Sequence, residues 1–232
     1  APLVVEEGIR WLKEKRDPKK PFFLNVWTHE PHLPIESDPK FMELYKEFED
    51  DGIRQHHGNV TQIDHAFGKL MKALDELGET DNTFVIFTSD NGRQPGQQGP
   101  NDNPSFTGHK WQSLEGGTRV PFIIRYPSKI QANKTNNSLV SAIDLYPTLA
   151  SVCDVKIDPP KDAQKLDGVD VWKNLSKSDT KPARTELLYW HGMGQATAIR
   201  KGNWKLFFNY GSNKHDSDPV QSDGYSLYDL KD

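Results

Sequence analysis

The feature that most constrains the fold is a helical pattern between two short apolar runs. Apolar residues recur at helical spacing from Asn59 to Leu77, and Gly78 follows where a glycine often ends a helix. The runs Phe22–Trp27 and Phe84–Phe87 have the length of buried strands. Because strand, helix and strand in this order are typical of a mostly parallel sheet with helical connections, we expect an α/β fold.

Further elements are predicted on both sides of this unit. Leu3–Lys15 and Ile143–Val152 have helical patterns, and Val120–Tyr126 has the pattern of a strand. Beyond a polar connector, three strand-like segments are joined by tight turns: "TELLYW", "TAIRKGNWKLFFN" and "YSLYDL". We expect residues 1–155 to belong to an α/β domain, and residues 156–232 to form a connector and a small antiparallel subdomain.

Charge and composition exclude several classes of function. The formal net charge of -4 argues against a nucleic-acid partner, because phosphate binding normally needs a concentrated basic patch. No stretch approaches the roughly 20 apolar residues that span a bilayer. Since Cys153 is the single cysteine, an intrachain disulfide and a cysteine-based zinc site are excluded.

Polar loops follow two of the predicted strands at their carboxyl ends, where ligands gather in open α/β sheets. The loop after the second strand contains Asp90 and Asn91, whose oxygens suit Ca²⁺ or Mg²⁺ better than zinc or copper. Asp-Asn-Gly is also a common turn, and Ca²⁺ takes about six to eight oxygens. From these residues alone, a metal site and a simple turn both stay open.

Three further side chains could act on an anionic ester. His29 and His32, in the loop "THEPHLP", could donate a hydrogen bond or a proton to a leaving oxygen, or could bond only to loop backbone. Lys110 begins "KWQSLEGGTRVP" and could neutralise an anionic substrate, or could be an ordinary surface lysine. We interpret Glu115 and Arg119 as a charged pair that fixes the Gly-Gly turn.

Taken in order, these segments resemble the type I sulfatases of the alkaline phosphatase superfamily, such as arylsulfatases and N-acetylgalactosamine-6-sulfatases. The series is "PFFLNVWTHEPHLP", "QIDHAFGKLMKALDELGETDNTFVIFTSDNG", "GHKWQSLEGGTRVPFIIRYP", "SAIDLYPTLASV" and "LDGVDVW". The resemblance implies an alkaline-phosphatase-like fold and hydrolysis of a sulfated sugar or an aryl sulfate. It implies that Asp90 and Asn91 bind Ca²⁺ in preference to Mg²⁺. It also implies that His32 and Lys110 contact the sulfate and the leaving group, with His29 beside them.

One departure from the family pattern concerns the nucleophile. Sulfatases use a formylglycine made from the Cys or Ser of a C-x-P/A-x-R motif, and an earlier Asp-Asp pair supplies further calcium ligands. Neither occurs here, since Cys153 precedes "DVKI" and Ser37 has Phe41 in place of the required arginine. We therefore expect a C-terminal portion of a longer sulfatase, inactive alone, whose parent would be periplasmic, secreted or lysosomal by family resemblance.

Two other functions stay open. A phosphonate or phosphodiester hydrolase of the same superfamily more often has histidine after the strand-end aspartate, so Asn91 favours sulfate. A non-catalytic carbohydrate-binding relative could stack Trp27 and Trp111 on a sugar, although both could equally be core aromatics. The loop at residues 92–108 would shape the entrance to the site, with Gln97, Asn101 and Asn103 as candidate partners of sugar hydroxyls.

Overall fold

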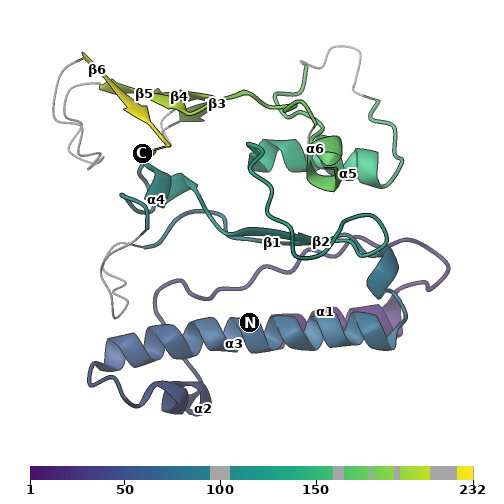
Figure 1. The fold of residues 1–232 in the computed structure, drawn as a ribbon. Coiled ribbons are helices and arrows are strands. Elements are labelled where there is room, and N and C mark those ends of the chain that lie inside the picture. Colours follow the sequence, from purple (N-terminus) through teal and green to yellow (C-terminus); the bar gives the residue numbers. More distant parts are fainter. Residues whose placement is uncertain (95–104, 159–164, 178–179, 191–193, 210–223, 232) are drawn as a thin grey trace.

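The computed structural model has three layers, with a small sheet between a helical layer and a C-terminal layer (Figure 1). The structure describes residues 1–94, 105–158, 165–177, 180–190, 194–209 and 224–231. Much of the predicted entrance loop, including Gln97, Asn101 and Asn103, lies outside these ranges. No helix within the described ranges is long and apolar enough to cross a membrane.

Two long helices form the first layer and run side by side (Figure 1). Helix α1 (Pro2–Arg10) continues into a π-helical turn (Trp11–Lys15), and α3 spans Asp51–Glu76. Between them lie α2 (Pro39–Met42) and a 3₁₀ turn (Glu43–Tyr45), and another 3₁₀ turn (Thr80–Asn82) follows α3. The apolar faces of α1, of its π-helical turn and of α3 supply most of the buried core in this layer: Val5, Leu12, Ala66, Ala73 and Leu74.

The pattern at Asn59–Leu77 is confirmed as part of α3, although the helix begins eight residues earlier than predicted. The Asp50 carboxylate accepts a hydrogen bond from Ile53 N at 2.9 Å, which satisfies a free donor of the first turn. The first turns of α3 lack a strong apolar period, so only the Asp50 cap marks the start of the helix. At the other end Gly78 has φ 70°, the left-handed conformation that glycine adopts without steric cost.

The middle layer is a pair of strands, β1 (Val85–Thr88) and β2 (Phe122–Arg125). Both were predicted, and they pair antiparallel, with Val85 opposite Arg125 and Thr88 opposite Phe122. Aromatic contacts attach the pair to both neighbouring layers. Phe87 lies 5.4 Å from Phe67 of α3, and Phe84 lies 5.7 Å from Trp172, measured between ring centroids.

The prediction of a buried strand at Phe22–Trp27 is wrong for the described structure. Side chains alternate between half-buried and exposed along this segment, as they would in a strand, but no described strand pairs with it. Phe23 and Trp27 are 74% and 81% exposed. An extended chain becomes part of a sheet only where a neighbouring strand takes up its backbone groups, and the described residues offer none here.

The C-terminal layer contains short helices and a separate sheet. Helix α4 spans Glu115–Thr118, a 3₁₀ turn (Ala142–Asp144) leads into α5 (Leu145–Val152), and α6 spans Trp172–Ser176. The antiparallel sheet has the order β3 (Glu186–Trp190), β4 (Ala196–Lys201), β5 (Trp204–Asn209) and β6 (Gly224–Asp229). The predicted small antiparallel unit is therefore confirmed, whereas a domain boundary at residue 155 stays a prediction.

A buried carboxylate ties the parts of this layer together. Asp144 is fully buried, and both of its oxygens accept hydrogen bonds from Arg184, at 2.7 and 2.5 Å. Backbone N–H groups of Ser141 and Val169 also donate to it, each at 2.9 Å. The side-chain hydrogen bonds with Asp144 raise the pKa of Arg184, although burial of the guanidinium opposes the change. The pair fixes the start of α5 against the segment that leads into β3.

Candidate active site

The loop at "THEPHLP" and the turn that carries Lys110 meet in space. Lys110 Nζ lies 3.2 Å from His32 Nε2, although the residues are 78 positions apart. His32 Nδ1 lies 2.7 Å from the carbonyl oxygen of Leu33, which can only accept a hydrogen bond. Nδ1 therefore carries a proton, and in the neutral ring Nε2 accepts a hydrogen bond from the lysine. The His29 ring lies 5.5 Å from the His32 ring, so three predicted residues come together.

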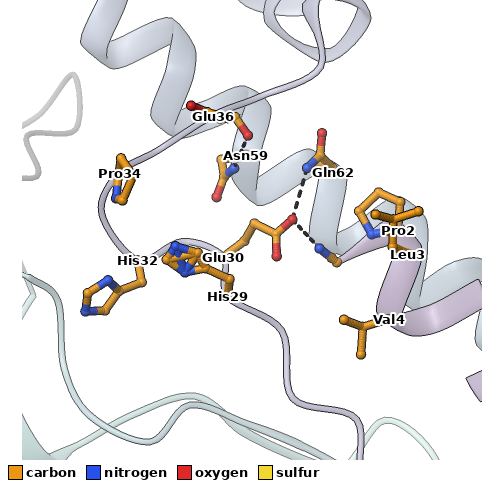
Figure 2. Close-up of a pocket in the computed structure, with 11 residues that line it drawn as sticks. Pro2, Leu3, Val4, His29, Glu30, His32, Pro34, Glu36, Asn59 and Gln62 are labelled. Carbon is orange, nitrogen blue, oxygen red and sulfur yellow. Dashed lines mark hydrogen bonds and ion pairs between the residues drawn. The ribbon is translucent and has the colours of Figure 1, made fainter. Parts of the chain in front are cut away.

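A pocket of ≈ 490 Å³ opens beside these histidines, between their loop, the start of α1 and the middle of α3 (Figure 2). Glu30 Oε1 accepts a hydrogen bond from Gln62 Nε2 at 3.1 Å and contacts the Ala1 nitrogen. Asn59 Nδ2 donates to the backbone oxygen of Glu36 at 3.1 Å. Within the described structure, Glu30 Oε2 and Asn59 Oδ1 are buried without a partner, so the pocket wall offers unused acceptors.

Glu30, Asn59 and Gln62 were not predicted to belong to a site. A signal was present in the sequence, because Asn59 and Gln62 lie three residues apart and therefore on one face of the predicted helix. In the structure both are buried, at 1% and 7% exposure. Polar side chains on a buried helix face normally have a specific partner. The loop supplies it here, through Glu36 and Glu30.

The Asp90–Asn91 loop packs backbone to backbone against the Gly-Gly turn of α4. Gly92 N donates to Gly117 O at 2.9 Å, and Lys110 N donates to Arg93 O at 2.8 Å. A Cβ atom on Gly92 would lie 1.8 Å from Gly116 O, so a larger residue does not fit. The loop with the predicted metal ligands is thus attached directly to the turn that presents Lys110.

Asp90 is exposed and Asn91 is half-buried just beyond the end of β1. Their oxygens are hard donors of the kind that Ca²⁺ prefers, so they fit two positions of a calcium site. Among the described residues there is no group of three or more His, Cys, Asp or Glu side chains that could hold a metal. The remaining oxygens would therefore come from outside this set of side chains.

A buried lysine on the C-terminal sheet supports the Lys110 turn. Lys205 is 0% exposed, and its Nζ donates to Glu115 Oε1 at 2.9 Å and to the backbone oxygen of Ser113. The same ammonium lies 3.9 Å from the ring centroid of Tyr189. Burial, and then the negative charge of Glu115, raise the pKa of Tyr189 to about 12.

The predicted charged pair of Glu115 and Arg119 is only part of this arrangement. Arg119 Nη1 lies 3.9 Å from Glu115 Oε2, and the Arg119 side chain is 55% exposed. Lys205 is both closer and buried, so it is the stronger partner. Lys205 was not predicted to take part, because a lysine in an apolar strand pattern has no local signal for a partner 90 positions away.

Of the two alternatives for Trp27 and Trp111, the structure contradicts the one that makes them core aromatics. Trp111 is 65% exposed and Trp27 is 81% exposed. Both lie close in the chain to a predicted site residue. Trp111 directly follows Lys110, and Trp27 lies two residues before His29. Their exposure leaves both indole rings accessible to a ligand.

Comparison with known proteins gives the family. The sulfatase family model matches residues 3–155, and the model for the C-terminal part of N-sulphoglucosamine sulphohydrolase matches residues 109–232. The chain belongs to the sulfatase family. It is 33% identical over 197 residues to an N-acetylgalactosamine-6-O-sulfatase of Bacteroides thetaiotaomicron, covering 81% of this chain and 36% of that protein. It is 31% identical over 199 residues to arylsulfatase J of Mus musculus, covering 85% and 32%.

Solved structures show the same fold for this sulfatase chain. The crystal structure of Ps i-CgsB in complex with k-i-k-neocarrahexaose matches with a TM-score of 0.78 and 27% identity, covering 99% of this chain and 48% of that one. The PsFucS1 sulfatase from Pseudoalteromonas sp. matches with a TM-score of 0.77 and 26% identity, covering 98% and 44%. These relatives confirm the alkaline-phosphatase-like α/β fold. The sulfatase chain spans about a third of the length of the curated relatives.

Proposed function

We propose that this chain supplies the calcium-binding and leaving-group-binding part of a sulfuric ester hydrolase. The observation that carries the proposal is the contact between Lys110 and His32, which brings two widely separated predicted residues within 3.2 Å. The Asp90–Asn91 loop supports it, because its neighbour Arg93 accepts a hydrogen bond from Lys110 N. Membership of the sulfatase family is consistent with all of these roles.

In the proposed reaction Lys110 and His32 act on the oxygen that bridges sulfur and the alcohol. The Lys110 ammonium would neutralise charge on the sulfate group and on the leaving oxygen. The ammonium bears the proton that the leaving alcohol would take, and its contact with His32 Nε2 would hold this donor in position. The Leu33 carbonyl orients the His32 ring, and His29 lies beside it as a further donor to sulfate.

Asp90 and Asn91 would hold Ca²⁺ through their side-chain oxygens. When bound, this ion would supply Lewis-acid stabilisation of negative charge on the sulfate. Mg²⁺ is the less suitable ion, because it demands near-ideal octahedral geometry, whereas Ca²⁺ accepts the varied oxygen ligands of flexible loops. The attachment of Gly92 to Gly117 would keep this ligand loop in register with Lys110.

The nucleophile would come from polypeptide outside these 232 residues. By family resemblance it is a formylglycine, and no C-x-P/A-x-R motif occurs in the sequence. The chain alone is therefore proposed to be inactive. A sulfated sugar is the proposed substrate class, with aryl sulfates as simpler analogues. It is supported by the N-acetylgalactosamine-6-O-sulfatase relative and by the carrageenan-oligosaccharide complex of Ps i-CgsB.

The test uses the full-length natural protein. Peptide-mapping mass spectrometry should find a Cys or Ser converted to formylglycine, and the protein should hydrolyse an aryl sulfate faster than the matching aryl phosphodiester. Preference for the phosphodiester would instead indicate a phosphodiester hydrolase. Binding of sulfated sugars without turnover, and without formylglycine, would indicate a carbohydrate-binding relative.

A further inference from the structure

Trp111 is exposed next to Lys110 and has an unusual backbone conformation. Its φ is 78°, in the left-handed region, and the residue is 65% exposed. A bulky residue is unfavourable in this region, whereas glycine adopts it without steric cost. Residues held in such conformations cluster at functional sites. The chain therefore places a tryptophan where backbone geometry alone would favour a glycine.

Hydrogen bonds on both sides fix the turn that presents this tryptophan. Gln112 N donates to His109 O at 3.0 Å, and His109 N donates to Gln112 Oε1 at 3.1 Å. Gln112 is 8% exposed, so these bonds are largely shielded from water. A positive φ at the third residue is what a type II turn requires. Lys110 and Trp111 thus occupy the two central positions of a rigid turn.

The Lys110 ammonium contacts both the Trp111 indole ring and His32 of the candidate active site. Lys110 Nζ lies 5.7 Å from the ring centroid of Trp111, within the reach of a cation–π interaction, and 3.2 Å from His32 Nε2. A sulfate bound by Lys110 would therefore have its attached organic group next to the indole. The ring is large, rigid and costs little conformational entropy on binding, as in other binding surfaces built on tryptophan.

We propose that Trp111 stacks on the sugar ring whose sulfate is bound by Lys110. The inference rests on the proposed function and adds to it a residue that selects saccharide sulfates. The ligand class is a sulfated pyranose, because one face of such a ring presents C–H groups that pack on an aromatic face, while its sulfate reaches Lys110.

The experiment compares three variants of the full-length protein: Trp111→Ala, Trp111→Phe, and Trp204→Ala with Trp111 unchanged. Trp204 is a matched control, because it is 52% exposed and lies on β5 of the other sheet. The probes are N-acetylgalactosamine 6-sulfate and a carrageenan oligosaccharide as substrates, and inorganic sulfate as an inhibitor without a ring. Trp111→Ala should raise KM for the saccharide by about two- to tenfold, as expected for loss of an aromatic stacking contact. The inhibition constant of sulfate should stay unchanged, and Trp111→Phe should recover part of the loss.

Other outcomes separate this inference from the proposed function. Equal weakening of saccharide and inorganic sulfate would show general damage to the Lys110 turn and overturn the stacking role, as would wild-type values for Trp111→Ala. If the wild-type protein cleaves no sulfate ester, the proposed function fails, and calorimetric binding of the same saccharides decides the role of Trp111. Failure of the wild-type protein to bind or cleave either saccharide would overturn the assignment of a sugar ligand.

Discussion

Lys205 on β5 and Glu115 at the start of α4 form a buried ion pair at 2.9 Å across 90 positions of the chain. The Lys205 side chain is 1% exposed and that of Glu115 is 15% exposed. The pair joins the C-terminal sheet to the segment that presents Lys110. Removing one partner of such a pair leaves an uncompensated charge in a shielded place, which costs more than the pair itself contributes.

Replacement of this lysine is therefore expected to destabilise the fold strongly. Lys205→Met should lower the free energy of unfolding by about 3–5 kcal/mol, because Glu115 and the Ser113 carbonyl lose their shared donor. The measurement is denaturant unfolding of the full-length protein. Lys201→Met is the matched control on the neighbouring strand. Its side chain is 79% exposed and its ion pair with Glu186 spans 3.8 Å, so a change of less than about 1 kcal/mol is expected.

A double variant shows whether the charge or the packing is responsible. Adding Glu115→Gln to Lys205→Met removes the unpaired carboxylate and should recover part of the lost stability. Unfolding of Lys205→Met at the wild-type denaturant concentration would contradict the anchoring role of this pair.

Lys110 is expected to matter for catalysis much more than for folding. Lys110→Ala should lower kcat for an aryl sulfate by a factor on the order of 10²–10³, the range for removal of one preorganised donor at a developing charge. Lys110→Arg should restore little, because a planar guanidinium does not reproduce a compact ammonium held against His32. Steady-state kinetics of the full-length protein provides the measurement, with the exposed Lys129→Ala as control. Activity of Lys110→Ala near the wild-type level would remove Lys110 from the site.

Calcium binding is expected to depend on Asp90. Asp90→Ala removes the carboxylate of the predicted Asp90–Asn91 ligand pair, so calcium affinity should fall at least about tenfold and hydrolysis should fall with it. Titration calorimetry with Ca²⁺ measures the affinity independently of turnover. Asp81→Ala is the control, because Asp81 is an exposed carboxylate in a 3₁₀ turn before the same strand. An unchanged calcium affinity in Asp90→Ala would place the metal elsewhere.

The elements with a local signal could be predicted from the sequence. The apolar period and Gly78 were enough to predict α3 from Asn59 onward, and the apolar runs were enough to predict β1 and β2. Pairing could not be derived in this way. The antiparallel contact of β1 with β2 depends on backbone partners 34 to 40 positions apart. The segment Phe22–Trp27 has the side-chain pattern of a strand but no described partner strand.

The same limit applies to the candidate site. His32 and Lys110 were predicted as site residues through the sulfatase resemblance. Their contact with each other could be seen only in the folded chain. The Glu30 and Gln62 hydrogen bond and the Lys205 and Glu115 ion pair were missed for one reason. Each joins polar groups whose neighbours in sequence give no sign of the partner.

Stability is expected to fall on acidification through His56 on α3. Burial of the ring, and then the positive charge of His57, lower the pKa of His56 below its ordinary value of 6.5. Its Nδ1 is buried and has no hydrogen-bond partner within the described structure, and the two imidazole rings lie 5.9 Å apart. The folded state therefore favours the neutral ring, and protonation favours the unfolded state.

The sign of this effect follows from the two pKa values. The unfolded chain binds a proton at His56 near pH 6.5, whereas the folded chain binds it only at lower pH. The contribution of His56 to stability is thus fully present above pH 6.5 and is lost as pH falls through the lowered pKa, with a slope of at most about 1.4 kcal/mol per pH unit. Denaturant unfolding between about pH 5 and 7 should show this slope in the wild-type protein, and His56→Gln should reduce it. An NMR titration of His56 with its midpoint at or above the ordinary value would contradict the prediction, because the folded and unfolded chains would then not differ in the required direction.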